Sequence, residues 1–222
     1  MPHQTPDLTG RKALVLGANH PTAAAIALAF AKAGADVAVT STTGDPEEAF
    51  ALRPLRRAIE AEGRRAIADI ADLGNGSSVQ IAVRQIAKQL GRIDLLVIAS
   101  SEAIDKPSER ITDAEWSRAL GLNLGAYFYA CRTIAREFAA NEPVEGVKGR
   151  IIALLPPVDP APGTAIRLAA RAAAETLIDA LADEWREAGI RVTAIALSPD
   201  TPEAEAVQQA LSLASGAGAD PP

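Results

Sequence analysis

The sequence is almost without cysteine, which excludes two ways of holding a fold together. Its 222 residues include one cysteine, Cys131, so the chain can form no internal disulfide and no cysteine-rich zinc site. In the stretch "YFYACRTIA" this residue is predicted to be a small buried side chain rather than a nucleophile. We expect no metal site. A hydrophobic core must supply the stability, and 48% hydrophobic residues suffice for one globular domain.

The sequence also lacks an excess of positive charge and any long apolar run. With 22 Lys and Arg against 28 Asp and Glu, its net charge is -6, which gives no general attraction to nucleic acid or to anionic membranes. No stretch is apolar over the length that spans a bilayer, and the start, "MPHQTPDLTGRKALVLG", lacks the layout of a signal peptide. We therefore expect a cytoplasmic protein that binds neither nucleic acid nor membranes.

The chain does contain a regular alternation of short apolar runs and longer alanine-rich amphipathic stretches. The expected strands are residues 12–17, 36–40, 65–70, 94–100, 150–155 and 191–197. The expected helices are residues 21–33, 46–62, 76–90, 112–140 and 164–188. This alternation is typical of strand-helix-strand units over a parallel sheet, and continuous apolar strands such as "DLLVIA" indicate burial on both faces.

One segment indicates which kind of α/β fold the chain adopts. "RKALVLGANHPTAAAIALAFAKAGADVAVT" reads as strand, turn, helix and strand, the unit that places a helix N-terminus against a dinucleotide pyrophosphate. It resembles the opening of the short-chain dehydrogenase/reductase family. Further segments resemble that family in the same order: "ADIAD", "GRIDLLVIASS", "GLNLGAYFYA" and "EAGIRVTAIA". The resemblance covers about residues 9–201 and implies an α/β fold, a Rossmann-like doubly wound parallel sheet of about six strands with helices on both faces.

The domain organisation follows from this resemblance. We expect one domain over residues 1–205, then a short helix and a frayed tail over residues 206–222, because the final "SGAGADPP" has nothing to bury. Family members continue into a lid and a seventh strand. Both are expected to be lost here.

The resemblance also assigns positions that would hold a nucleotide. They are Gly17, Asn19, His20, Thr40, Ser41, Asp69 and Ile70. Pro21 and Ala23 replace two glycines of the first turn, and Pro21 brings ring bulk and no N–H where phosphate would approach. Residues 40–42 include no acid to hold a ribose 2'-hydroxyl, which favours NADP over NAD. We therefore expect either no cofactor or weakly bound NADP.

The catalytic positions implied by the family are mostly replaced. Asn123 matches the active-site asparagine, but Arg167 and Arg171 stand at the positions of the tyrosine acid and its lysine. The serine position falls on the dipeptide 155–156, Leu-Pro, which has no hydroxyl. A guanidinium stays protonated and has no acceptor, so Arg167 cannot replace the tyrosine as a proton donor. The two arginines could line a cleft for an anionic small ligand, or form a solvated stripe in which Arg171 pairs with Glu175.

Several functions remain open from these residues. One is a non-catalytic subunit or scaffold that dimerises with itself or with an active relative through helices 112–140 and 164–188, which form a dimer interface in the family. Another is a non-redox enzyme, similar to the halohydrin dehalogenases, that uses the arginine-lined cleft. The replacement bases for such an enzyme would be Glu102, Asp159 and His20. The third is an NADP-dependent reductase with weak or unusual activity.

Overall fold

A computed structural model of the chain describes residues 6–216. Most of the expected tail, from residue 217 onward, lies outside this range. Within it the chain alternates strands with helices in the order expected for repeated strand-helix-strand units. In the described part of the chain, no helix combines the length and the apolar composition that crossing a membrane requires.

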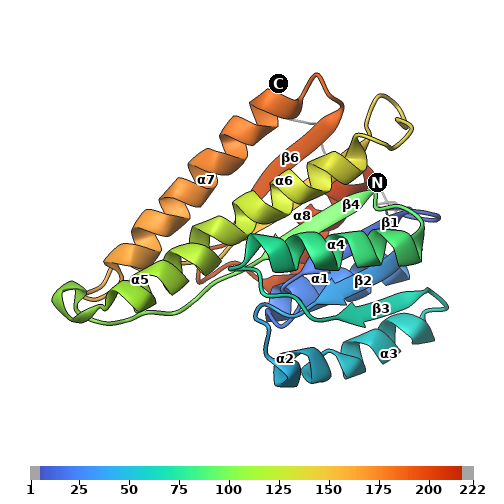
Figure 1. Cartoon of the computed structure of the whole chain (residues 1–222). Coiled ribbons are helices and arrows are strands. Elements are labelled where there is room, and N and C mark those ends of the chain that lie inside the picture. The colour runs from blue at the N-terminus through green and yellow to red at the C-terminus, as the bar shows by residue number, and fades with distance from the viewer. Residues whose placement is uncertain (1–5, 217–222) are drawn as a thin grey trace.

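Six strands form one parallel sheet, which confirms the predicted fold class. They are β1 (Lys12–Leu16), β2 (Asp36–Thr40), β3 (Ala66–Asp69), β4 (Leu95–Ala99), β5 (Gly149–Leu155) and β6 (Ile190–Ala196). Their order is β3-β2-β1-β4-β5-β6, so the chain winds outward from β1 in one direction and then from β4 in the other (Figure 1). The central pair is joined over four positions, with Val15 opposite Val97. The edge where β1 and β4 end is therefore the place where such folds hold ligands.

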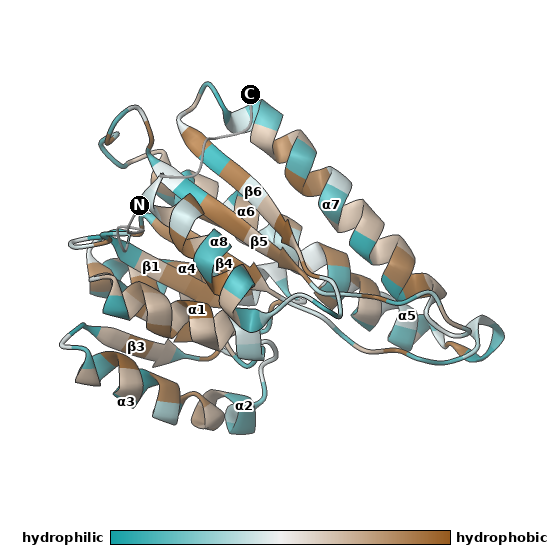
Figure 2. Cartoon of the chain, turned by 180° about the vertical axis from the view of Figure 1, so that it is seen from behind, coloured by the Kyte–Doolittle hydropathy of each residue, from teal (hydrophilic) through white to brown (hydrophobic). Residues whose placement is uncertain are grey.

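Helices cover both faces of this sheet. They are α1 (Pro21–Lys32), α2 (Pro46–Ala51), α3 (Arg53–Ala61), α4 (Gly76–Leu90), α5 (Asp113–Leu120), α6 (Ala126–Phe138), α7 (Ala165–Trp185) and α8 (Glu203–Ser215). A short 3-10 turn, η1 (Ser108–Arg110), precedes α5. Helices α4, α6 and α7 share a buried apolar cluster on one face, whereas α1, α3 and α8 share a second cluster on the other. The strands between these layers are largely hydrophobic, as Figure 2 shows.

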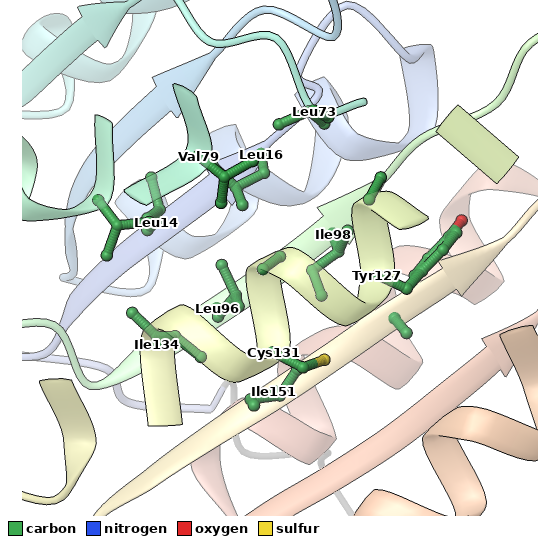
Figure 3. Packing of buried hydrophobic residues seen from close by; sticks show 14 of the residues in the cluster. Leu14, Leu16, Leu73, Val79, Leu96, Ile98, Tyr127, Cys131, Ile134 and Ile151 are labelled. Atoms are coloured by element: carbon green, nitrogen blue, oxygen red, sulfur yellow. The ribbon is translucent and has the colours of Figure 1, made fainter. Parts of the chain in front are cut away.

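The cluster on the α6 face includes the lone cysteine. Cys131 is fully buried there, as predicted, and burial raises the pKa of its thiol to about 12. Figure 3 shows Cys131 and Tyr127 on α6 packed with Ile98 of the sheet. The cysteine is therefore an inert packing residue.

Two of the predicted helices are interrupted. The expected helix 46–62 is wrong as a single element, because α2 ends at Ala51 and α3 begins at Arg53. The cause is Pro54, which has no N–H and whose ring would meet the carbonyl of Phe50 in a continuous helix. The expected helix 112–140 contains a π-helical turn, η2 (Gly121–Gly125), between α5 and α6. Such a turn widens the helix, and here it carries Asn123.

The last helix belongs to the domain. The expected boundary at residue 205 falls inside α8, whose Ala206, Ala210 and Ala214 are buried in the same cluster as α1. Small residues on both helices let them pack closely, so residues 203–215 complete one face of the sheet.

The loop before α5 is fixed by a capping box. The Thr112 hydroxyl accepts a hydrogen bond from the Glu115 N–H at 3.3 Å, and the Glu115 carboxylate accepts one from the Thr112 N–H at 2.9 Å. Lys106 also donates to this carboxylate at 2.9 Å. The Lys106 hydrogen bond, with the Thr112 bonds, lowers the pKa of Glu115 from 4.5 to about 2. Because the folded-state pKa is lowered, this stabilisation is present above pH 4.5 and is lost as the pH falls toward 2.

Thr112→Ala should lower the free energy of unfolding by about 1 kcal/mol, because it removes an N-cap. Urea denaturation at neutral pH measures this loss. The control is Thr176→Ala on α7, where an exposed hydroxyl donates to the Ala172 carbonyl inside the helix; this variant should stay within about 0.5 kcal/mol of the original. Equal losses in the two variants would contradict the role of the cap.

Candidate functional site

The first turn of the sheet passes close to the end of β4. Gly17 has φ +78°, and a Cβ at this position would collide with the Ala99 carbonyl oxygen. Only glycine adopts this conformation and leaves this space. The turn thus brings β1 against β4 at the point where the strand order reverses.

The start of α1 offers few groups to an anion. Pro21 occupies the first helical turn and supplies no N–H, and the side chain of the preceding His20 does not cap the helix. The Nδ1 atom of His20 is buried without a hydrogen-bond partner. Burial lowers the pKa of His20, and the Glu203 carboxylate opposes that shift. The shift favours the neutral form of this imidazole.

Asn19 ties the first turn to the segment after β2. Its Nδ2 donates to the Glu48 carbonyl oxygen at 3.1 Å, and its Oδ1 accepts from the Thr42 N–H at 3.2 Å. Both ends of the amide are therefore engaged within the chain. The side chain of Asn19 therefore ties the first turn to α2.

Thr40 and Ser41 are fully buried at the end of β2. The Thr40 hydroxyl donates to the Ser41 carbonyl at 3.0 Å, and the Ser41 hydroxyl accepts from the Ala71 N–H at 3.1 Å. These bonds hold β2 to the segment that follows β3. Both hydroxyls are thus engaged within the chain.

A carboxylate that the sequence did not indicate lies beside the end of β2. The Glu48 carboxylate, on α2, accepts hydrogen bonds from the N–H groups of Thr42 at 3.1 Å and Thr43 at 2.9 Å. The strand itself ends without an acid, as its sequence shows. The acid arrives from the next helix, because α2 folds back over the strand end.

Asp69 and Ile70 lie in a different groove from Glu48. They line the space between β3 and the helices α2 and α3, where the Arg53 guanidinium lies 4.2 Å from the centre of the Phe50 ring. Asp69 Oδ1 accepts from the Ile70 N–H at 2.8 Å. Of the predicted nucleotide residues, Asp69 and Ile70 are the two that line this groove.

Asn123 holds the segment that follows β4. In the π-helical turn, its Oδ1 accepts from the Glu102 N–H at 2.9 Å and its Nδ2 donates to the Glu102 carbonyl at 3.1 Å. The side chain is nearly buried. Like Asn19, it satisfies main-chain groups of its own chain.

Arg167 and Arg171 lie together at the start of α7 and line one small cleft with Asn123, Tyr127 and Pro156. Each of the two interpretations of these arginines, as cleft residues and as members of an ion-paired stripe, therefore agrees with part of the structure. They line the cleft, yet each has a partner within the chain: Arg167 pairs with Asp105 at 2.7 Å and Arg171 with Glu175 at 3.3 Å. Arg171 Nε also donates to the Pro156 carbonyl at 3.0 Å.

The candidate replacement bases lie outside that cleft lining. Glu102 pairs with Arg118 at 2.9 Å, whereas Asp159 lies on an exposed loop and His20 on the first turn. Among the described residues that line the cleft, none is a carboxylate or a histidine. A general base beside the two arginines is therefore not provided by these three residues.

Sequence reasoning missed Tyr127, whose phenol lies inside the same cleft. Its hydroxyl lies 3.0 Å from the Ser100 carbonyl and 2.7 Å from the Leu154 carbonyl. Burial raises its pKa above the ordinary value. Its position four residues after Asn123, on the same side of the helix, was the available signal. The phenol joins the ends of β4 and β5 and is a weaker acid than a free tyrosine.

The hydroxyl of Ser100, unlike the Tyr127 phenol, does not join two strands. It is buried and has no hydrogen-bond partner among the described residues. An unpaired buried hydroxyl is costly, so it marks the end of β4 as a place where a water molecule could bind.

Comparison with known proteins gives one consistent result. A family model described as short chain dehydrogenase matches residues 11–210. The 3beta-hydroxysteroid dehydrogenase 1 of Eggerthella lenta is 32% identical over 86% of this chain and 70% of its own length. The D-threitol dehydrogenase of Mycolicibacterium smegmatis is 33% identical over 58% of this chain, and the match spans 48% of that relative.

Comparison with solved structures agrees with this result. A metagenomic short-chain oxidoreductase in complex with NADP superposes with a TM-score of 0.80 at 27% identity, covering 94% of this chain and 91% of its own. A dehydrogenase/reductase from Sinorhizobium meliloti 1021 superposes with a TM-score of 0.74 at 30% identity, covering 92% and 81%.

Tyr127→Phe should lower the free energy of unfolding by about 1–3 kcal/mol, because two buried carbonyls lose their shared donor. The matched control is Tyr129→Phe, the same chemical change two residues along α6, where the described part of the chain records no hydrogen bond to the hydroxyl. Thermal and urea unfolding of both variants measure the difference. If Tyr127→Phe is as stable as Tyr129→Phe, the phenol does not hold the two strands.

Proposed function

The chain belongs to the short-chain dehydrogenase/reductase family, and on that basis we propose that it is a non-catalytic member, a pseudoenzyme subunit or scaffold. The family resemblance gives the positions of the tyrosine acid and its lysine to Arg167 and Arg171, and the serine position to Leu155-Pro156. A guanidinium carries no transferable proton at neutral pH, and a leucine-proline pair offers no hydroxyl. Carbonyl reduction would lack both its proton source and the group that orients the substrate.

The observation that carries the proposal is that most of the cleft's polar side chains, all except Ser101, bind their own chain. Arg167 and Arg171 pair with carboxylates, Asn123 binds the main chain of Glu102, and Tyr127 donates to the Leu154 carbonyl of β5. Any substrate would have to displace contacts that hold the surrounding loops. Such a site supports structure better than it supports turnover.

For the cofactor we propose either none or weakly bound NADP. In support of a nucleotide, Gly17 keeps the tight turn between β1 and α1, at the place where a fold of this class binds the pyrophosphate. Pro21 removes an N–H from the helix start where the pyrophosphate would bind. When bound in an active relative, such a cofactor supplies a hydride. The residues described here would hold its nucleotide half more readily than they would use its hydride.

For partners we propose a homodimer, or a heteromer with an active relative, formed through α5, α6 and α7. The exposed side of α6 carries Phe128 and Arg132, with the guanidinium 5.1 Å from the centre of the ring. On the exposed side of α7 lie the small residues Ala172 and Ala173. Small side chains on one helix and an aromatic anchor on another suit close helix packing. A cytoplasmic location remains part of this proposal.

An alternative is a reductase of weak or unusual activity. It is favoured by the relatives, which are named as dehydrogenases, and by the phenol of Tyr127 within the cleft. A non-redox enzyme that binds an anion at Arg171 is a further alternative, favoured by the guanidinium at the family's lysine position. Both would need the arginine contacts to open.

We expect no oxidation of NADPH above the enzyme-free rate with a panel of ketones and acyl-thioester ketones, because the proton donor is absent. Absorbance at the nicotinamide band measures this, with an active family member as the positive control. Turnover at rates ordinary for the family would overturn the proposal. In that case, loss of activity in Tyr127→Phe but not in Arg171→Met would identify the phenol as the acid.

A further inference from the structure

A groove lies at one edge of the sheet, between β3 and the helices α2 and α3. Figure 1 shows the two helices beside β3, which has a single neighbour in the sheet, β2. The groove has a volume of about 680 Å³, within the range of binding pockets. None of its lining residues belongs to the cleft at Arg167 and Arg171. It is therefore a separate surface of the molecule.

The main chain of β3 is paired on one side. The Val37 N–H of β2 donates to the Arg65 carbonyl at 2.9 Å. Because successive strand residues direct their main-chain groups to opposite sides, the N–H and C=O groups of Ala66 and Ala68 point away from β2. Within residues 6–216, no hydrogen bond of these four groups is recorded. A strand edge of this kind can pair with one more strand.

Three arginines of α3 border the same groove. Arg53, Arg56 and Arg57 are all exposed. Arg56 lies 3.8 Å from Glu60 in an exposed pair, which contributes little. For Arg53 and Arg57, no ion pair with a carboxylate is recorded in the part of the chain that the structure describes. Asp69 is the one carboxylate among the described lining residues, so the groove is a positive region on a chain of net charge -6.

An exposed aromatic ring adjoins these charges. Phe50 of α2 is 62% exposed, and the Arg53 guanidinium lies 4.2 Å from the centre of its ring. Stacking of this kind holds the two side chains together. The main chain between them is anchored by Leu52, which is buried in the same cluster as α1. The ring and the guanidinium are therefore preorganised, which lowers the entropy cost of binding a partner.

These features favour one kind of occupant. A second copy that paired its own β3 with this edge about a two-fold axis would bring two sets of three guanidinium groups together, and like charges at a strand pair are destabilising. An extended acidic segment has no such cost. Its main chain would complete the hydrogen bonds of β3, and its carboxylates would accept from the arginines.

We propose that this edge, formed by β3, α2 and α3, is a docking site for an extended acidic segment of another protein. The segment adds a strand beside β3 and places its carboxylates against Arg53 and Arg57. The inference goes beyond the proposed function, because it does not depend on what the cleft binds. It gives a scaffold a second surface, at the opposite end of the sheet from α7 (Figure 1).

The test uses the full chain, labelled with ¹⁵N, and a capped peptide of alternating Glu and Val residues, about six residues long, the usual length of a strand. The control peptide has Gln in place of each Glu. NMR titration gives the dissociation constants, and we expect the Gln peptide to bind at least about tenfold more weakly, because it loses the charge-assisted hydrogen bonds. Amide hydrogen exchange of Ala66 and Ala68 should slow when the Glu peptide binds, since strand pairing protects their N–H groups.

Three variants separate the contributions of charge and main chain. Arg53→Gln combined with Arg57→Gln should weaken binding of the Glu peptide at least about tenfold. The matched control combines Arg84→Gln with Lys88→Gln, two exposed cations four residues apart on α4, and should stay within about twofold of the original chain. Ala68→Pro keeps all the arginines and removes one outward N–H group, at a position where an edge strand tolerates proline, and it should also weaken binding.

Each of five results would overturn the inference: no saturable binding of the Glu peptide, equal binding of the Gln peptide, equal losses in the two double variants, unchanged exchange at Ala66 and Ala68 in the complex, or displacement of the peptide by NADP⁺. The last result would assign the groove to a nucleotide. The proposed function fails separately, through hydride transfer measured without peptide. The amide spectrum of each variant reports whether it is folded, so a misfolded variant cannot be mistaken for a loss of binding.

Discussion

The pairing of β1 with β4 is the constraint on which the rest of this structure depends. It joins the half of the sheet that winds toward β3 to the half that winds toward β6. The helices that follow the two central strands leave on opposite faces, so the carboxyl ends of these strands are not covered by either layer. The polar groups of the chain at this edge must therefore be satisfied by a ligand, by water or by other parts of the chain.

This chain satisfies much of that edge by itself. Asn19 and Glu48 close the end of β2, Tyr127 joins β4 to β5, and Arg171 binds the Pro156 carbonyl after β5. Each contact lies at the edge of the sheet where folds of this class bind ligands. Polar side chains that hold loops tightly favour a stable cleft, and they reduce the free energy that a ligand can gain by binding there. The sheet and its helices are thus kept, while the polar groups at this edge bind other parts of the same chain.

The fold was predictable because local patterns of apolar and polar residues indicate its strands and helices. Apolar runs predict the strands, and amphipathic stretches predict the helices between them. The break between α2 and α3 could have been inferred from Pro54. The family positions of Asn123, Arg167 and Arg171 were implied by the resemblance to the family. Their clustering in one cleft agrees with that alignment.

The contacts of the site were not predictable, because they join residues far apart in the chain or on neighbouring elements. Arg167 meets Asp105 across 62 positions, and no local pattern pairs the two. Glu48 looks like a solvated helix residue in sequence, and only the folding of α2 over β2 turns its carboxylate inward. Thr40 and Ser41 show the converse, since hydroxyls at a strand end resemble ligand contacts until their burial is known.

Native mass spectrometry of the protein purified gently from its own source tests the central claim most directly, because one spectrum reports subunit composition and retained nucleotide together. The account predicts an assembly of two or more family-type subunits in which this chain carries no NADP. A chain that retains NADP in one-to-one amount would contradict it, since the cleft would then serve a redox cofactor rather than its own loops.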